Sequence, residues 1–273
     1  MKKHKNLIYP QWQGGNDIST YFGAKEIEQL YLSDVTYKEV PVSTFEELKL
    51  ENDIIGYQEI LEQMKCAAKI ISHDCPQTLF TVGGSCDADF PPIAYLNHKY
   101  EGNLTVLWLD AHGDLNTPGE SPSKLFYGMP LRALLGEGDA EILKLLESPL
   151  TPSQVILSGV RDLDANERNY ISENNITLQS VREIEDNMNI VMEAVKNAGN
   201  DNIYLHIDLD VMEPDEFPYT PVHAAGGVSV STFLSILQSL KKFNIVGVGI
   251  FEYNTANRKT ELITSIIDTG LHL

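Results

Sequence analysis

Apolar runs alternate with helix-patterned segments along most of the chain, and this alternation constrains the fold more than any other feature. The apolar runs occupy residues 7–12, 78–84, 104–110, 154–160, 203–211 and 245–253. They are apolar almost throughout, which is typical of strands covered on both faces. Segments with helical spacing lie between them, at 54–71, 129–147, 189–199 and 230–243. The pattern predicts an α/β fold, in which a parallel sheet carries helices on both faces.

The chain shows no internal boundary. Its 273 residues contain no shift in composition and no Gly/Ser-rich linker. The hydrophobic fraction of 42% supplies enough apolar material for a core and argues against intrinsic disorder. We therefore expect a single domain over residues 1–273.

Charge and cysteine content restrict the partners and the compartment. A formal net charge of −19 disfavours binding to nucleic acid or to anionic lipid, because both are polyanions. The odd set of Cys66, Cys75 and Cys86 suits a reducing compartment. No stretch approaches the roughly 18 apolar residues of a membrane span, and Pro10 interrupts the basic N-terminus before a run of signal-peptide length. We expect a cytoplasmic protein with neither nucleic-acid nor membrane partners.

Two carboxylate motifs occur where apolar strands end. In each motif the polar residues alternate: the first set is Asp110, His112 and Asp114, and the second is His206, Asp208 and Asp210. If the backbone stays extended, each set points to one side. Carboxylates on one face repel each other unless a cation lies between them, and open parallel sheets bind ligands at this edge. The motifs predict a site for one or two divalent ions, such as manganese.

Four segments resemble the arginase, agmatinase and formiminoglutamase group of manganese ureohydrolases. They are GGSCD (83–87), DAHGD (110–114), DLDVMEP (208–214) and FEYN (251–254). Glu213 stands where the family has an Asp, and the order and separations match over roughly residues 80–255. The resemblance implies an arginase-like fold with a central parallel sheet of about eight strands, and a homo-oligomer, trimeric or hexameric.

The resemblance also implies a two-metal site. Asp110 and Asp208 would bridge the two ions, His112 and Asp210 would complete the first, and Asp114 would belong to the second. The most expected metal is Mn²⁺, with one or two ions per chain.

The second ion lacks its usual imidazole, because Cys86 occupies that position. A thiolate is a soft ligand that favours zinc or iron(II), so Cys86 could bind a different ion; the alternatives are a weak or empty site, or a small buried thiol that fills space. His206 could compensate as a ligand or by orienting one, or it could be a core histidine bonded to a neighbouring element.

The loop after Asp114 is similar to the arginase branch in particular. In this chain, Asn116 and Ser123 match the residues that hold the α-carboxylate of arginine in the arginase branch. In GVRDLD (159–164), Asp164 matches the acceptor of the α-ammonium group. The resemblance therefore implies an amino-acid substrate with a guanidino group.

Three further residues receive catalytic roles from the resemblance. Glu252 would pair with the guanidinium, and Asp114 would steer a metal-bound hydroxide toward the guanidino carbon. Tyr127 stands where arginases carry a proton-shuttling His, and tyrosine relays protons poorly at neutral pH.

The implied activity is hydrolysis of a linear amidine or guanidine C–N bond, with release of urea or an analogous product. Two alternatives stay open: a catalytically degenerate member that serves as a ligand-binding or regulatory subunit, and a formiminoglutamate-type or amide-cleaving hydrolase. The degenerate alternative is motivated by the departures from the family pattern at Cys86, Tyr127 and Glu213.

Overall fold

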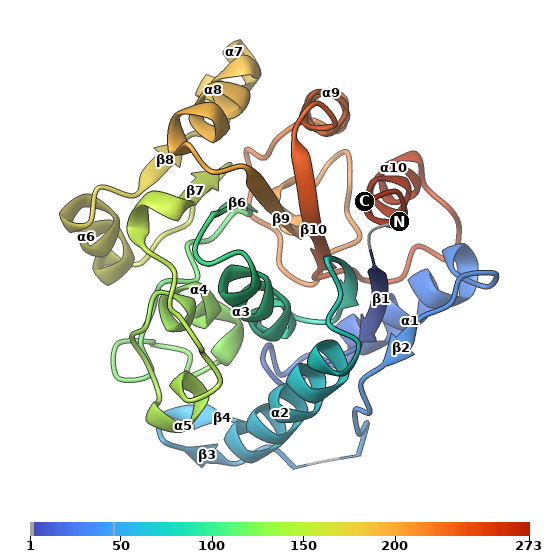
Figure 1. Ribbon diagram of the computed structural model, residues 1–273, viewed down its shortest axis with the longest axis vertical. Coiled ribbons are helices and arrows are strands. Elements are labelled where there is room, and N and C mark those ends of the chain that lie inside the picture. Colours follow the sequence, from blue (N-terminus) through green and yellow to red (C-terminus); the bar gives the residue numbers. More distant parts are fainter. Residues whose placement is uncertain (1–2, 46) are drawn as a thin grey trace.

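An eight-stranded sheet forms the centre of the computed structural model, which describes residues 3–45 and 47–273. The strand order is β2-β1-β5-β10-β9-β6-β7-β8, and every pairing in this sheet is parallel (Figure 1). The strands are β1 (His4–Tyr9), β2 (Lys38–Glu39), β5 (Thr78–Gly83), β6 (Leu104–Leu109), β7 (Val155–Ser158), β8 (Thr177–Gln179), β9 (Asn202–Asp208) and β10 (Asn244–Phe251). The predicted α/β class and the predicted number of strands are confirmed.

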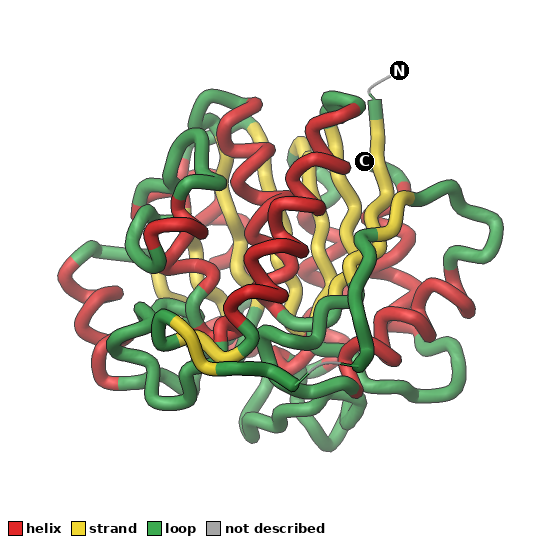
Figure 2. Tube along the Cα trace, turned by 90° about the horizontal axis from the view of Figure 1, so that it is seen from below, coloured by secondary structure: helices red, strands yellow, loops and turns green. Residues whose placement is uncertain are grey.

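Helices cover both faces of the sheet, which explains why the strands are apolar on both sides (Figure 2). The helices are α1 (Ser19–Tyr31), α2 (Tyr57–His73), α3 (Phe90–Lys99), α4 (Pro130–Leu134), α5 (Ala140–Leu143), α6 (Ala165–Glu173), α7 (Val181–Asp186), α8 (Asn189–Ala198), α9 (Val230–Leu240) and α10 (Glu261–Leu271). A short antiparallel hairpin, β3 (Leu50–Glu51) and β4 (Ile54–Ile55), precedes α2. Within the described ranges, no helix is long and apolar enough to cross a membrane.

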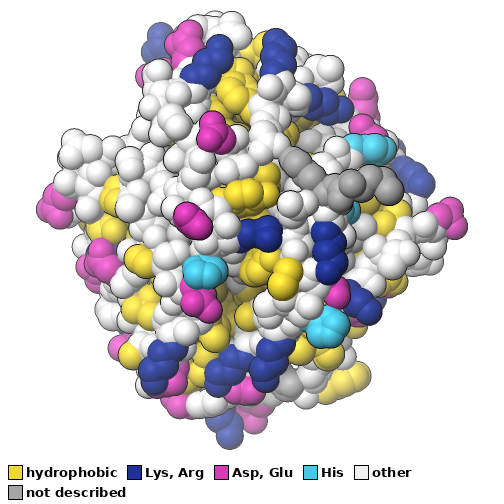
Figure 3. All heavy atoms as spheres, in the orientation of Figure 1, with side chains coloured by type: hydrophobic (Ala, Val, Ile, Leu, Met, Phe, Trp, Pro, Cys, Tyr) yellow, Lys and Arg dark blue, Asp and Glu magenta, His cyan; other side chains and the backbone are white. Residues whose placement is uncertain are grey.

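Two apolar cores lie on opposite faces of the sheet, because successive residues of a strand point to opposite sides. In β9, Tyr204 packs in the core formed with α2, α3 and α4, whereas Leu205 packs in the core formed with α1, α8, α9 and α10. On the surface, basic and acidic side chains are interspersed over the face shown in Figure 3.

The segment 129–147, expected to form one helix, is broken in two. Helix α4 ends at Leu134, and Gly136 adopts a left-handed φ of 92°. The next helix, α5, starts after Asp139, whose Oδ1 accepts hydrogen bonds from the backbone of Glu141 (3.0 Å) and Ile142 (3.1 Å). The expectation of a continuous helix was wrong, because a glycine stop and an Asp cap outweigh the apolar spacing.

A close approach of α1 to the segment after β10 predicts a strong stability effect at Gly23. A Cβ atom at Gly23 would lie 1.7 Å from the carbonyl oxygen of Tyr253. Gly23→Ala therefore forces the backbone apart, and we expect the free energy of unfolding to fall by about 3 kcal/mol. Urea denaturation measures this loss. The matched control is Gly119→Ala, where a Cβ meets nothing within 4 Å; equal stabilities of the two variants would contradict the argument.

Candidate metal centre

The candidate site lies at the carboxyl ends of four neighbouring strands. Cys86 follows β5 by three residues, Asp110 directly follows β6, Asp208 ends β9, and Glu252 directly follows β10. The sheet order β5-β10-β9-β6 places these strand ends side by side. Because all four strands run in the same direction, residues far apart in the sequence meet at one edge of the sheet.

A first group consists of Asp110, His112 and Asp210, whose potential ligand atoms lie within 4.8 Å of one another. His112 Nδ1 is 2.9 Å from Asp210 Oδ2 and 3.5 Å from Asp110 Oδ1. Burial opposes protonation of His112, but its hydrogen bonds to the two carboxylates and their charges outweigh burial and raise its pKa far above the usual value. Without metal, a charged imidazolium balances this carboxylate pair.

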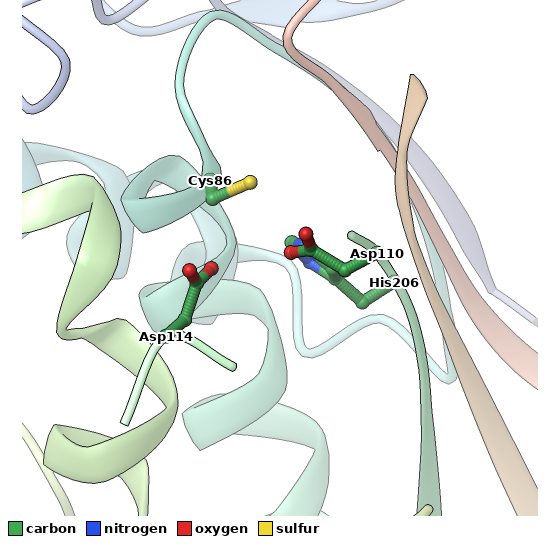
Figure 4. A group of neighbouring side chains, drawn as sticks. All are labelled: Cys86, Asp110, Asp114 and His206. Carbon is green, nitrogen blue, oxygen red and sulfur yellow. The ribbon is translucent and has the colours of Figure 1, made fainter. Parts of the chain in front are cut away.

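A second group consists of Cys86, Asp110, Asp114 and His206, again within 4.8 Å of one another (Figure 4). A third combines Cys86, Asp208 and Glu252. Cys86 belongs to both the second and the third group, and its thiol donates a hydrogen bond to Asp208 Oδ2 at 3.0 Å.

The burial of so many acids in one place disfavours their charged forms. Burial, followed by the charges of neighbouring carboxylates, raises the pKa of Asp110 to about 6 and those of Asp114, Asp208 and Glu252 well above their usual values. In addition, Asp114 Oδ2 is buried without a hydrogen-bond partner among the described residues. A divalent cation would both satisfy this oxygen and neutralise the cluster, so the donor set fits a metal ion.

The backbone that brings these side chains together is not the extended chain expected from the sequence. Strand β6 ends at Leu109, and Asp114 has a left-handed φ of 53°. Asp210 lies in the 3₁₀ turn Leu209–Val211 rather than in β9. His112 and Asp114 therefore diverge into different groups, and Asp110 belongs to both.

A cavity of about 210 Å³ opens beside the first two groups. Among the residues that line it are His112 and Asp114 of the metal centre, and the four predicted substrate or catalytic residues Asn116, Ser123, Tyr127 and Asp164. Asn116 Nδ2 donates to Asp164 Oδ2 at 2.9 Å, so two of these side chains already contact each other.

Tyr127 and Glu252 occupy different depths of the site. Burial, followed by the charge of Glu252, raises the pKa of Tyr127 to about 12, so at neutral pH its hydroxyl stays protonated. Glu252 does not line the cavity; its Oε1 accepts a hydrogen bond from the Cys86 backbone N–H at 3.2 Å. Its left-handed φ of 55°, together with a 2.8 Å hydrogen bond from its N–H to the Gly84 carbonyl, holds it within the carboxylate cluster.

Several supporting residues escaped the sequence analysis. Trp108 Nε1 donates to Asp110 Oδ2 (3.0 Å), and Asp89 Oδ2 accepts from His206 Nδ1 (2.8 Å). Glu167 accepts from the backbone N–H groups of Leu115 (3.0 Å) and Asp164 (2.8 Å) and so braces the two segments that line the cavity, one after Asp114 and one ending at Asp164. Only the last had a local signal, since Asp-x-x-Glu before a helix is a capping pattern.

Glu213, the departure from the family's acidic motif, braces a turn. Its Oε2 accepts a hydrogen bond from the Gly227 backbone N–H at 2.8 Å. Glu213 belongs to none of the three metal-ligand groups found among the described residues. The substitution of Glu for Asp therefore leaves these groups complete.

Comparisons with known proteins show which family the chain resembles. Residues 14–271 match the family model described as Arginase family. The arginase of Staphylococcus aureus (strain MSSA476) is 32% identical over 244 residues, which cover 84% of this chain and 80% of that protein. The arginase of Bacillus subtilis (strain 168) is 33% identical over 203 residues, or 72% of this chain and 67% of that protein.

Among solved structures, the fold is similar to that of Entamoeba histolytica arginase in complex with L-ornithine. The TM-score is 0.90 at 23% identity, over 100% of this chain and 99% of that chain. This likeness supports the fold, whereas the family model and the identities above 30% establish the relationship. The chain belongs to the arginase family.

Proposed function

We propose that this arginase-family chain is a metal-dependent hydrolase of the guanidino C–N bond of arginine or a closely similar amino acid, releasing urea or an analogous product. One observation carries the proposal: a single cavity joins the residues expected to bind an amino acid to the carboxylate cluster. A site with amino-acid-binding residues at one end and a carboxylate cluster at the other suits a substrate that carries an α-amino acid group and a guanidinium group at its two ends.

The metal-binding half would be formed by the strand-end residues. Asp110, His112, Asp208 and Asp210 would hold one divalent ion, and Cys86 and Asp114 would contribute to a second. The oxygen-rich donor set of the first ion suits Mn²⁺. When bound, such ions supply a Lewis acid that makes water nucleophilic near neutral pH.

The amino-acid half would be formed by residues that line the cavity. Asp164 offers a carboxylate to the α-ammonium group, and Asn116 and Ser123 offer polar groups to the α-carboxylate. Asn116 would donate to the α-carboxylate from Nδ2, whereas its Oδ1, buried without a hydrogen-bond partner among the residues described, is an acceptor that suits the α-ammonium group. The L-ornithine bound by the Entamoeba histolytica arginase is an α-amino acid of this kind and supports the assignment.

The reacting end would use Glu252 and Asp114. The Glu252 carboxylate, held inside the cluster, would pair with the guanidinium and direct its carbon toward the metal centre. Asp114, with its unpartnered Oδ2, would orient the attacking water. Tyr127, protonated at neutral pH, would donate a hydrogen bond from the cavity wall.

A comparison of L-arginine with agmatine, which lacks the α-carboxylate, tests the proposal. We expect the metal-loaded protein to release urea from arginine, and Ser123→Ala to lower kcat/KM for arginine about 10-fold, because a hydrogen bond to a charged group is lost. The same variant should leave agmatine turnover unchanged. Asp164→Asn should lower kcat/KM for both substrates, since both carry an ammonium group.

A broader substrate screen can contradict the assigned hydrolase activity. A fully metal-loaded protein that releases no product from a panel of guanidines and amidines would contradict hydrolysis. The trimeric or hexameric assembly and the cytoplasmic location stay predictions, which light scattering and cell fractionation can test.

A further inference from the structure

The imidazole of His206 is fixed rigidly at the base of the metal centre. The residue is completely buried, and its ring stacks on Trp108 at a centroid distance of 3.4 Å and on Phe251 at 4.9 Å. The sheet register places Trp108 of β6 beside His206 on one side and Gly249 of β10 on the other. A Cβ at Gly249 would lie 2.4 Å from the Phe251 ring and 2.8 Å from Asp89 Oδ1. The absence of a side chain at Gly249 therefore makes this arrangement possible.

Asp89 determines which ring nitrogen of His206 is available. His206 Nδ1 lies 2.8 Å from Asp89 Oδ2, and the other oxygen of Asp89 accepts a hydrogen bond from the Tyr204 hydroxyl. A carboxylate at Nδ1 places the proton on that nitrogen and leaves a lone pair on Nε2. In metalloproteins, a ligating histidine typically donates its other N–H to a carboxylate in this way.

His206 Nε2 has no hydrogen-bond partner in the part of the chain that the structure describes, although it is buried. An unsatisfied buried acceptor destabilises the fold, and a histidine with a purely structural role would be expected to have a partner for it. His206 offers a ring nitrogen to the group formed with Cys86, Asp110 and Asp114. Because Nδ1 is engaged by Asp89, Nε2 is the nitrogen that serves this group.

Figure 4 shows how the four side chains of this group converge. Asp110 and His206 come from the adjacent strand ends of β6 and β9, and both face Cys86 and Asp114. All four residues are buried, and Asp114 contributes a second unpartnered atom, Oδ2. Two buried acceptors without partners thus belong to one four-residue group.

We propose that His206 Nε2, oriented by Asp89, is the imidazole ligand of the second metal ion, which is held by Cys86, His206, Asp110 and Asp114. The inference rests on the proposed metal dependence but not on the identity of the substrate. The imidazole missing at position 86, after β5, is supplied instead from β9, so each of the two ions keeps one histidine. A donor set of one sulfur, one nitrogen and carboxylate oxygens favours Zn²⁺, Co²⁺ or Fe²⁺ over Mn²⁺ at this position.

Cobalt titration of the intact chain tests this ligand set, because Co²⁺ reports its ligands through its absorption spectrum. We expect two Co²⁺ per chain and a sulfur-to-cobalt charge-transfer band that Cys86→Ser removes. His206→Gln should weaken binding of the second ion at least about 100-fold, so that one ion and no sulfur band remain at limiting metal. Asp89→Asn should weaken it about 10- to 100-fold while the band survives at saturation. The exposed His98→Gln serves as the matched control and should retain both ions.

Two results would overturn the inference. One is a folded His206→Gln protein that binds two Co²⁺ with the wild-type spectrum and affinity. The other needs no variant: X-ray absorption of the wild-type protein with two Zn²⁺ bound should count two imidazoles and one sulfur per pair of ions, and a count of one imidazole would exclude His206. Neither measurement involves urea. Two bound ions without hydrolysis would therefore refute the proposed function and leave this inference standing.

Discussion

Removal of bound metal by a chelator is expected to lower the Tm of the protein by about 10 °C at neutral pH. The reason is the cluster of five buried acids, Asp110, Asp114, Asp208, Asp210 and Glu252. A ligand present at 1,000 times its Kd adds roughly 4 kcal/mol to the free energy of unfolding, and each kcal/mol shifts the Tm of a chain of this size by about 2–4 °C. Calorimetry with and without chelator measures the shift.

The effect should depend on pH in a defined direction. In the metal-free protein, burial and neighbouring carboxylates raise the pKa of Asp110 to about 6, above its usual value. A carboxyl group with a raised pKa in the folded state destabilises the fold as pH rises from its unfolded pKa through its folded pKa. Metal-free protein should therefore lose stability between about pH 4 and pH 6, and metal should add more to the Tm at pH 7 than at pH 5.

A double variant distinguishes destabilisation by carboxylate repulsion from a general loss of stability caused by mutation. In Asp110→Asn/Asp208→Asn, two buried charges are replaced by neutral groups of nearly the same shape. We expect the metal-free variant to melt at a higher temperature than metal-free wild type, and added metal to leave its Tm unchanged. A wild-type Tm that does not respond to chelation would argue against the metal centre.

Glu252→Gln is expected to lower kcat/KM for arginine about 10³-fold while the metal content stays the same. The substitution preserves shape and removes the charge that would face the guanidinium. Breaking one side of a buried ion pair costs roughly 3–5 kcal/mol, and each 1.4 kcal/mol corresponds to a factor of ten. Initial-rate urea assays combined with elemental analysis provide the measurement.

The metal analysis is essential because Glu252 also belongs to a group with Cys86 and Asp208. If activity and metal content fall together, Glu252 supports the metal rather than the guanidinium. The control is Glu120→Gln in the loop after Asp114. Its carboxylate accepts a hydrogen bond from Thr117 on the surface and does not line the cavity, so the kcat/KM of this variant should match wild type. A Glu252→Gln protein within about threefold of wild type would contradict the assigned role.

The class of fold was predictable because its signal is local. Buried parallel strands must be apolar on both faces, and the runs at 104–110 and 203–211 carry this pattern in their own residues. The helical segment 129–147 misled the same reasoning. Its apolar spacing is continuous, but Gly136 turns left-handed and Asp139 starts a new helix.

The candidate site was likewise predictable only in part. The sequence by itself determined that Asp110 and Asp208 stand at strand ends, and the family motifs around them assigned Asp114, Asp210 and Glu252. It did not determine how the chain turns beyond Leu109, where the left-handed Asp114 replaces the expected extended run.

Only the tertiary structure decided the role of His206. From the sequence, a core histidine and a compensating ligand were both possible, because Asp89 lies 117 residues away and carries no local pattern. The parallel sheet sets β9 between β6 and β10, so Trp108 and Phe251 enclose the imidazole and Asp89 takes one of its nitrogens. Which nitrogen is left for a metal depends on contacts between distant segments, and such contacts exist only after the chain has folded.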